Sequence, residues 1–541
     1  MEERRNDNQE MKRRRAEMKR KRRQRVLILR ALTLALLAAL LVTVIVVIRH
    51  VNKVKKNETG TKPATTESVT VTPAAESSAA APAGEASTAA PAETTPAAES
   101  TAVTPVPAYS GETPSTAEEA VARASSMVSM YDYDGALSLL QSYPGYENEP
   151  SITEKISAIT AEKSSLVQVD VSTTAHVFFH SLINDSRGLI ASSTCTEERV
   201  EKNNKAMVTV PEFKMMIQKM YEAGYVLISL DDLIVEKTAE DGSTYFEKNT
   251  NLYLPAGKKP LIMSEDDLSY YHSYGENGAQ GYADRLVLDE NGEVKCLFTT
   301  PEGEQVVGDY DMVPLMETFL KEHPDFCYKG ARPTIALTGY NGVFGYRTND
   351  YYKEGPEGED LNAAQKKFLV DHPEYDYDTD VAEATKIAEA LKKAGWTFAS
   401  HTYGHINATD ASYEKIVHDH ERWEIAVEKV IGPTNKIIFA FGADIGPVGG
   451  YTSDNAKYMY YKEQGFDIFC NVDGNIGWTE FGSQFVRTGR VALDGVSMYN
   501  AINPDAPSHK TYSRDFEILG ITDVESFFDG NRNPAYCLSE S

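Results

Sequence analysis

The sequence contains few cysteines and tryptophans, five and three among 541 residues. No two of the cysteines form a Cys-x-x-Cys pair, so the sequence predicts neither a zinc knuckle nor a disulfide framework. Basic residues are scarce after position 56: the formal net charge is −26, although the first 56 residues hold 17 Lys and Arg against 5 Asp and Glu. The remainder therefore carries about −38, which suits a solvated acidic surface and argues against nucleic acid as a partner.

Long uncharged runs are also rare, and one of them is long enough to cross a membrane. Residues 31–48 are almost wholly apolar, and with 26–29 they approach the length of a helix that spans ~30 Å of hydrocarbon. The basic stretch 12–25 before this run favours a cytoplasmic N-terminus. We predict a basic cytoplasmic tail over 1–30 and a single transmembrane anchor over 31–48, with the rest of the chain outside the cytoplasm. A cleaved signal peptide is the alternative, but the run ends without a small-x-small site.

Two segments separate the predicted anchor from the main body. Residues 49–116 are rich in Ala, Thr, Pro, Ser and Glu, a composition that predicts an extended linker. Residues 117–168 have apolar residues at helical spacing and are similar to one tetratricopeptide-like helical hairpin. Two interpretations of this hairpin stay open: a helical collar packed on the main domain, which we favour, or a module that binds a protein partner.

From residue 169 to 541, strand-like and helix-like segments alternate, which predicts an α/β domain with a largely parallel sheet. The predicted strands are 175–179, 226–229, 260–263, 334–338, 397–400, 437–441 and 467–471. The predicted helices include 211–223, 313–322, 381–393, 413–431 and 453–464. Two insertions interrupt this alternation, a predicted hairpin over 286–307 and a Gly- and Tyr-rich loop over 340–377.

The strongest chemical signal is the pair His401 and His405 in the run Ser-His-Thr-Tyr-Gly-His. Two imidazoles four residues apart can point at one centre. Asp266 and Asp267 follow another predicted strand, and a carboxylate from there completes a three-ligand site with an open position for water. Two His and one carboxylate also form the centre of Fe(II) oxygenases. Their usual His-x-Asp spacing is absent here, so a hydrolytic metal centre is favoured.

These two runs resemble the first two motifs of the polysaccharide deacetylases, carbohydrate esterase family 4. The family's Thr-Phe-Asp-Asp-Gly motif corresponds to residues 264–268, where Glu265 and Leu268 replace Phe and Gly. Its His-Ser/Thr-x-x-His motif is matched in full by residues 401–405. Three further runs, 175–180, 210–213 and 224–230, resemble the poly-N-acetylglucosamine deacetylase branch. The resemblance covers about residues 172–500 and implies a distorted (β/α) barrel with its chemistry at the C-terminal ends of the strands.

The resemblance also implies roles for the residues of the two motifs. Asp267, His401 and His405 hold one divalent metal ion, for which Zn²⁺ is the expected identity, and Asp266 is the general base. The general acid is expected to be His180, because this branch uses the histidine of its opening strand and no Leu-His motif occurs near the C-terminus.

The expected substrate contacts lie later in the chain. A backbone N–H near Phe441 or Gly442 is expected to stabilise the oxyanion, and Trp478 is expected near the acetyl methyl group. The family's third motif usually carries an Arg that orients the base, and residues 439–444 contain none.

We therefore expect a single-pass membrane protein of the bacterial cell envelope that removes acetyl groups from an N-acetylated polysaccharide of the cell wall or an exopolysaccharide. The alternative keeps the fold and loses the reaction: a catalytically degenerate glycan-binding protein. The missing Arg and the changes at Glu265 and Leu268 favour this alternative, whereas the intact motif carboxylates and histidines oppose it.

Overall fold

The computed structural model describes residues 111–472 and 476–537, and all of them belong to one compact unit. The predicted tail and anchor and nearly all of the predicted linker lie outside these described residues. Within the described part of the chain, none of the helices has the length and apolar character needed to cross a membrane.

Seven parallel strands close into a barrel. In order around the barrel they are β2 (Ala175–His180), β7 (Lys259–Asp266), β11 (Thr334–Leu337), β12 (Thr397–Ser400), β13 (Lys436–Ile438), β14 (Ile468–Val472) and β16 (Phe485–Ala492). Each strand pairs with the next, and β16 pairs with β2 to complete the circle. The expected class of fold, a (β/α) barrel, is confirmed by this pairing.

The barrel is distorted at two places. Strand β3 (Tyr225–Leu227) pairs with the first residues of β7, whereas β11 pairs with its last residues. Strand β15 (Thr479–Gly482) runs antiparallel to β16 on the outside of the circle. The predicted strand 437–441 ends at Ile438, because a 3₁₀ turn follows.

Successive side chains of each strand point alternately into the barrel interior and outward toward the covering helices. Ala175, Val177 and Phe179 of β2 pack with residues of α6 (Val210–Glu222) in the outer core. The interior core takes one small or aliphatic side chain from most strands, including Ile262, Ala336, Ala399, Ile438, Cys470 and Val486. Side chains that follow Ile262 on the same face of β7 therefore point to the interior, at the carboxyl end of the barrel.

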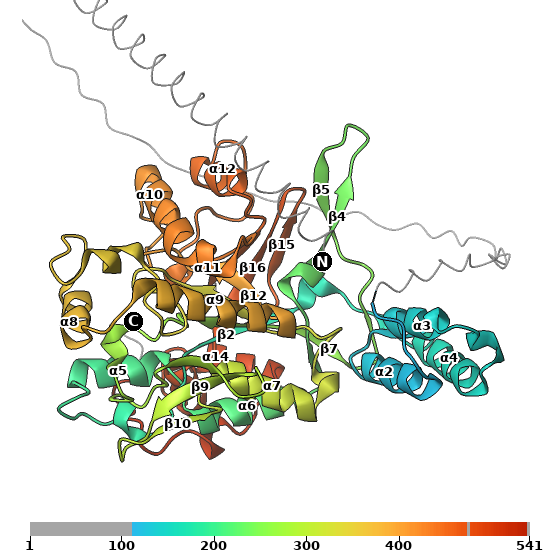
Figure 1. Ribbon diagram of the computed structural model, residues 1–541, viewed down its shortest axis with the longest axis horizontal. Helices are drawn as coiled ribbons and strands as arrows, with labels where there is room; N and C mark the ends of the chain where they lie inside the picture. The colour runs from blue at the N-terminus through green and yellow to red at the C-terminus, as the bar shows by residue number, and fades with distance from the viewer. Residues whose placement is uncertain (1–110, 473–475, 538–541) are drawn as a thin grey trace, which may run out of the picture. The chain divides into compact units, whose positions relative to one another are not determined.

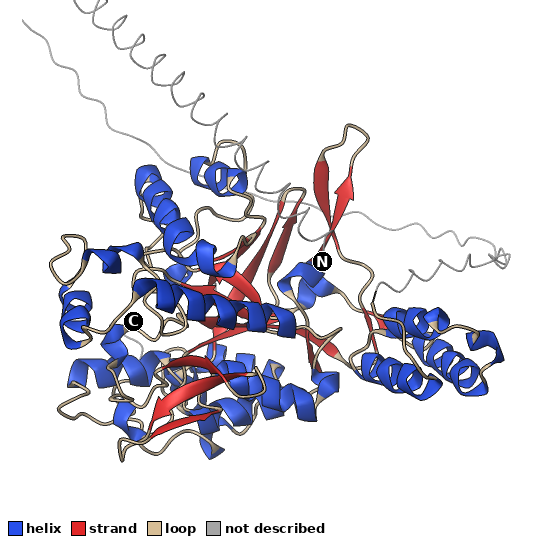
Figure 2. Ribbon diagram, viewed as in Figure 1, coloured by secondary structure: helices blue, strands red, loops and turns tan. Residues whose placement is uncertain are grey.

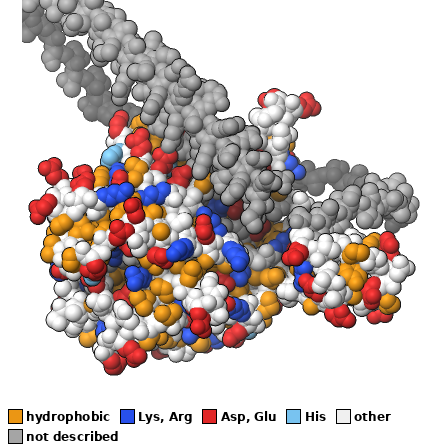
Figure 3. All heavy atoms as spheres, viewed as in Figure 1, with side chains coloured by type: hydrophobic (Ala, Val, Ile, Leu, Met, Phe, Trp, Pro, Cys, Tyr) orange, Lys and Arg blue, Asp and Glu red, His pale blue; other side chains and the backbone are white. Residues whose placement is uncertain are grey.

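Helices cover the barrel on its outside (Figures 1 and 2). They are α6, α7 (Met312–Glu322), α9 (Tyr377–Ala394), α10 (Tyr413–Trp423), α12 (Ala456–Glu463), α13 (Gly495–Ile502) and α14 (His509–Ile518). On the face drawn in Figure 3, acidic side chains are spread widely and interspersed with Lys and Arg.

Several insertions decorate the barrel. The segment predicted as a hairpin over 286–307 is a three-stranded antiparallel sheet of β8 (Arg285–Leu288), β9 (Val294–Thr299) and β10 (Gln305–Gly308). The 340–377 insertion contains a short 3₁₀ helix, Asp350–Glu354, and α8 (Ala363–Asp371). Strands β4 (Ile234–Thr238) and β5 (Thr244–Lys248) form a protruding hairpin (Figure 1) that the sequence did not predict.

The segment before the barrel contains three helices, α2 (Ala117–Ser129), α3 (Tyr133–Ser142) and α4 (Pro150–Lys163). Their apolar side chains share one buried cluster with Val226 and Tyr328 of the barrel domain. The Tyr131 hydroxyl donates to the carbonyl of Asp325 at 2.8 Å. The helices therefore pack on the barrel domain as a collar does, and a protein partner for them stays a prediction.

Candidate metal centre

Asp266 and Asp267 reach one site because the chain turns sharply at the end of β7. Asp267 has a left-handed backbone, with φ of 63°, a conformation that Asp tolerates better than most residues. Its N–H donates to the carbonyl of Ala336 on the neighbouring strand at 3.1 Å. Leu268 does not have a positive φ and is fully buried in the core. The family's glycine is therefore unnecessary in this turn, and its replacement by Leu268 leaves the carboxylates in place.

The loop after β12 is held by a carboxylate from α10. Asp419 accepts hydrogen bonds from the N–H groups of Tyr403 and Gly404, at 2.7 and 2.8 Å. Thr402 and His405 both have positive φ, 63° and 49°, so the loop coils tightly enough to bring both histidines to one side. This conformation costs free energy, and the two hydrogen bonds to Asp419 offset part of that cost.

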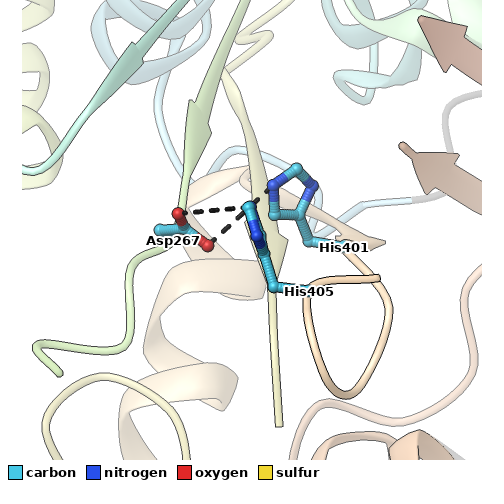
Figure 4. Close-up of side chains that lie close together, drawn as sticks. All are labelled: Asp267, His401 and His405. Atoms are coloured by element: carbon cyan, nitrogen blue, oxygen red, sulfur yellow. Dashed lines mark ion pairs between the residues drawn. The ribbon is translucent and has the colours of Figure 1, made fainter. Parts of the chain in front are cut away.

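The side chains of Asp267, His401 and His405 converge (Figure 4). The Nε2 atom of His405 is 3.7 Å from one oxygen of Asp267, and the Nε2 atom of His401 is 3.9 Å from the other. One ligand atom from each residue lies within 4.8 Å of the other two. Metal–ligand bonds of 2.0–2.1 Å in tetrahedral geometry place ligand atoms about 3.4 Å apart. The three residues therefore fit a small divalent ion after a slight contraction.

Hydrogen bonds from neighbouring groups orient these ligands. The Nδ1 atom of His401 lies 2.8 Å from the carbonyl oxygen of Ile438, which makes Nδ1 the donor and leaves the lone pair of Nε2 facing the centre. The hydroxyl of Tyr271 donates to Asp267 at 2.5 Å. Such partners fix the ring tautomer and the carboxylate rotamer before any ion binds.

Asp266 lies beside this trio and is held by Arg490 of β16. The Nη1 atom of Arg490 donates to Oδ1 of Asp266 at 2.8 Å, and both side chains are almost fully buried. Burial acts to raise the pKa of Asp266, but the Arg490 guanidinium and His401 outweigh it and lower this pKa to about 2. The same Nη1 atom donates to Ser264 at 3.2 Å. Asp266 is thus held as an ionised and oriented carboxylate.

Arg490 is the functional residue that the sequence analysis missed. The expected arginine is absent from residues 439–444, and the structure supplies one from the last barrel strand instead. A signal existed in the sequence, because Arg487 and Arg490 interrupt an otherwise uncharged strand-like run at 485–492. Charged residues in a buried strand are unusual unless they have partners.

His180 ends β2 and is the register partner of Asp266 on β7. Paired residues of parallel strands project to the same face, so His180 and Asp266 both point to the carboxyl end of the barrel. The Nδ1 atom of His180 lies 3.2 Å from the carbonyl oxygen of Ala206, and the ring is half-buried. Four residues earlier, His176 is fully buried, and burial holds its pKa well below the ordinary value.

Phe441 and Gly442 also lie at the centre. The ring of Phe441 is 4.4 Å from the ring of His405 and is 69% exposed, on a backbone with φ of 60°. The N–H of Gly442 donates to the carbonyl of Phe439 at 3.0 Å, so this N–H is not free to stabilise an oxyanion. A side chain at Gly442 would approach Val472 to 2.4 Å. The glycine therefore allows close packing beside an exposed aromatic platform.

Trp478 lies just before β15, and its carbonyl accepts from the N–H of Gly489 at 3.1 Å. Its half-buried ring is 5.4 Å from the guanidinium of Arg487. Arg487 is bound in turn by Asp444 and Glu480. This network orders the loop that follows Phe441, and a contact of Trp478 with substrate stays a prediction.

Comparison with known proteins agrees with these observations. Residues 368–460, which include His401 and His405, match the family model for polysaccharide deacetylases. This match includes the second motif and confirms the resemblance to the polysaccharide deacetylases, whereas residues 264–268 lie outside it. No curated protein sequence matches the chain.

Two solved structures overlap with it at low similarity. One is the Streptococcus pyogenes deacetylase PplD in complex with acetate, with 13% identity, a TM-score of 0.28, and coverage of 60% of this chain and 93% of PplD. The other is the deacetylase domain of BpsB from Bordetella bronchiseptica, with 11% identity, a TM-score of 0.28, and coverage of 59% and 97%. Both overlaps are weak, and the barrel is defined by its own strand pairing.

Proposed function

We propose that the chain is a metal-dependent deacetylase that hydrolyses the acetamide groups of an N-acetylated polysaccharide. The observation that carries this proposal is the meeting of Asp267, His401 and His405 beside an ionised, arginine-held Asp266. A hydrolytic centre needs three ligands, an open coordination position and a base at its edge. All of these groups lie at the carboxyl end of the barrel.

The residues divide the chemistry between them. Asp267, His401 and His405 would hold a divalent ion, for which Zn²⁺ is the expected identity, and this ion would lower the pKa of bound water toward ~7 and polarise a carbonyl. Asp266 accepts the proton of the attacking water, and Arg490 keeps that carboxylate ionised and in place. His180, on the adjacent strand, donates a proton to the leaving amine nitrogen. Phe441 offers an exposed ring to the apolar face of the sugar.

Arg490 also bears on the alternative function, a glycan-binding protein without activity. The absence of the third-motif arginine favoured that alternative. Arg490, at 2.8 Å from Asp266, takes the place of that missing arginine beside the proposed base. Leu268 does not disturb the turn that positions Asp266 and Asp267. Catalysis is therefore the function that the site supports best.

Acetate release tests the proposal. Chelator-treated protein is assayed on N-acetylated chitooligosaccharides and on peptidoglycan, before and after addition of Zn²⁺, with Asp266→Asn as the inactive control. We expect metal-dependent acetate release that the control lacks. An O-acetylated substrate distinguishes amide from ester hydrolysis. Glycan binding without acetate release by folded, metal-loaded protein would establish the degenerate alternative.

The cellular setting is a separate part of the proposal. The basic stretch 12–25 and the apolar run 31–48 support a single-pass anchor in a bacterial cell membrane, with the barrel outside the cytoplasm. A linker over 49–116 would let the barrel reach polysaccharide at some distance from the membrane.

A further inference from the structure

A cavity of about 460 Å³ lies outside the metal centre, and none of its lining residues is one of the candidate metal ligands. Its walls come from the segments that follow β7 and β11, which leave the barrel at the same end as the metal ligands. Tyr274 lines this cavity, and its ring is 5.4 Å from the ring of Tyr271. The hydroxyl of Tyr271 in turn donates to Asp267. Two aromatic rings therefore separate the cavity from a metal ligand.

The insertion 340–377 builds the outer part of this cavity. Phe368 of α8 and Tyr375 line it from one side, and Arg285 of β8 lines it from the other. A volume of this size falls within the range of small-ligand sites, and flat aromatic walls with convergent polar groups are typical of them. The insertion therefore makes a binding site that the barrel alone would lack.

The charges of the lining are mixed and predominantly acidic. Two of the side chains, Arg285 and Arg347, are arginines, and five are carboxylates: Glu276, Asp284, Glu374, Asp376 and Asp380. His372 also lines the cavity, and its two ring nitrogens lie 3.1 and 3.2 Å from Glu276 and Glu374, which leaves Asp380 as a carboxylate that His372 does not pair. Asp380 is half-buried, and this burial raises its pKa even though one of its oxygens accepts the backbone N–H of Arg347 at 2.7 Å. A cationic ligand would relieve the desolvation cost of that carboxylate.

Arg347 is a second polar group of the lining. Its side chain is 6% exposed, and its Nη1 atom donates to the carbonyls of Tyr270 and Asn341 at 3.1 and 3.2 Å. Its Nε atom is buried and has no hydrogen-bond partner among the described residues. A buried donor without a partner is costly and is normally paired with a ligand or water. The cavity wall therefore holds a guanidinium beside the Asp380 carboxylate.

We propose that this cavity binds a sugar unit that carries a free, protonated amine, next to or near the unit whose acetamide lies at the metal centre. The inference rests on the proposed function, because deacetylation itself converts neutral units of the polymer into ammonium-bearing ones. The ammonium group is recognised by Asp380 and its neighbouring carboxylates, the sugar hydroxyls by Arg347, and the ring face by Phe368. The preferred substrate is then a partially deacetylated chain.

Binding measurements test this site without turnover. The His401→Ala variant, which cannot hold the metal ion, is titrated calorimetrically with a glucosamine tetramer and with the N-acetylglucosamine tetramer. We expect the glucosamine tetramer to bind more tightly, with an affinity that falls as salt rises. Asp380→Asn in the same background is expected to weaken that binding by about tenfold or more, as loss of a charge-assisted contact does. The matched control is Asp241→Asn, which makes the same change at the tip between β4 and β5.

Phe368→Ala provides a second variant that leaves every charge in place, and it is expected to weaken both tetramers. Equal affinity for the two tetramers overturns the proposal, as does an Asp380→Asn affinity equal to that of Asp241→Asn. Because no step depends on acetate release, a protein that binds glucosamine units here and yet fails to hydrolyse N-acetylated glycans would refute the proposed function and leave the site standing.

Discussion

Replacement of Arg490 by methionine leaves the Asp266 carboxylate buried without its cation. Removal of one partner from a buried ion pair usually costs about 3–5 kcal/mol of stability. The lowering of the pKa of Asp266 from 3.8 to about 2 corresponds to roughly 2.4 kcal/mol in favour of the carboxylate, which is of the same order. We therefore expect Arg490→Met to lose about 2–5 kcal/mol of free energy of unfolding at neutral pH.

The loss has a definite dependence on pH. Because the folded-state pKa of Asp266 is lowered, the stability it contributes is present above pH ~4 and is lost only as the pH falls through about 2. In Arg490→Met, burial instead raises this pKa, so the variant improves when the carboxylate is protonated. The gap between variant and wild type should therefore shrink as the pH falls from 7 toward 4.

Urea denaturation of the chelator-treated proteins measures this gap. Asp266→Asn combined with Arg490→Met removes both charges and should recover much of the loss. Arg487→Met is a matched control, since Arg487 is a buried arginine of the same strand that binds Asp444; Asp266→Asn should not rescue it. Equal stability of Arg490→Met and wild type at pH 7, or no recovery in the double variant, would refute the role given to Arg490.

Four further outcomes are expected. Alanine in place of any one metal ligand (Asp267, His401 or His405) should abolish metal retention, measured by atomic emission. Asp266→Asn should keep the ion and lose turnover. His180→Ala should retain metal and reduce kcat by roughly 10²–10⁴-fold, the usual worth of positioned proton transfer; normal turnover of the folded variant would assign His180 a structural role. Glu265→Gln should be more stable than wild type at pH 8 in thermal unfolding, because burial beside Asp311 raises the pKa of Glu265; stability from such a raised carboxyl is present below pH ~4 and is lost as the pH rises. Protease added to intact cells should degrade the barrel and spare a short N-terminal stub, and full protection of the barrel would contradict the predicted topology.

Local patterns in the sequence were enough to predict the convergence of the metal ligands. The histidine spacing and the paired aspartates are each contained within a short run of residues. Six of the seven strands of the closed barrel coincide with apolar runs of strand length. The seventh, β16, carries two arginines and a glycine, so its pattern does not resemble a buried strand. Arg490 was missed with it, because its partner Asp266 lies 224 residues away along the chain.

Glu265 was misread for a related reason. As a departure from the family motif, it weighed against an intact active site. In the structure its side chain points away from the barrel interior, toward Asp311 at the start of α7, and no donor among residues 111–472 and 476–537 reaches either of its oxygens. A carboxyl in this position is stable when it carries a proton that it shares with Asp311. The face on which a residue lies depends on strand register, which the motif alone does not reveal.

The pairing of β2 with β16 joins the first barrel strand to the last. In a closed barrel, the order of the site residues along the chain depends on which strand comes first in the sequence. Asp266 is flanked by His180 from the first strand and is bound by Arg490 from the last. During synthesis, the metal ligands all emerge before residue 490 does. Asp266 therefore gains its arginine partner only when β16 completes the ring of strands.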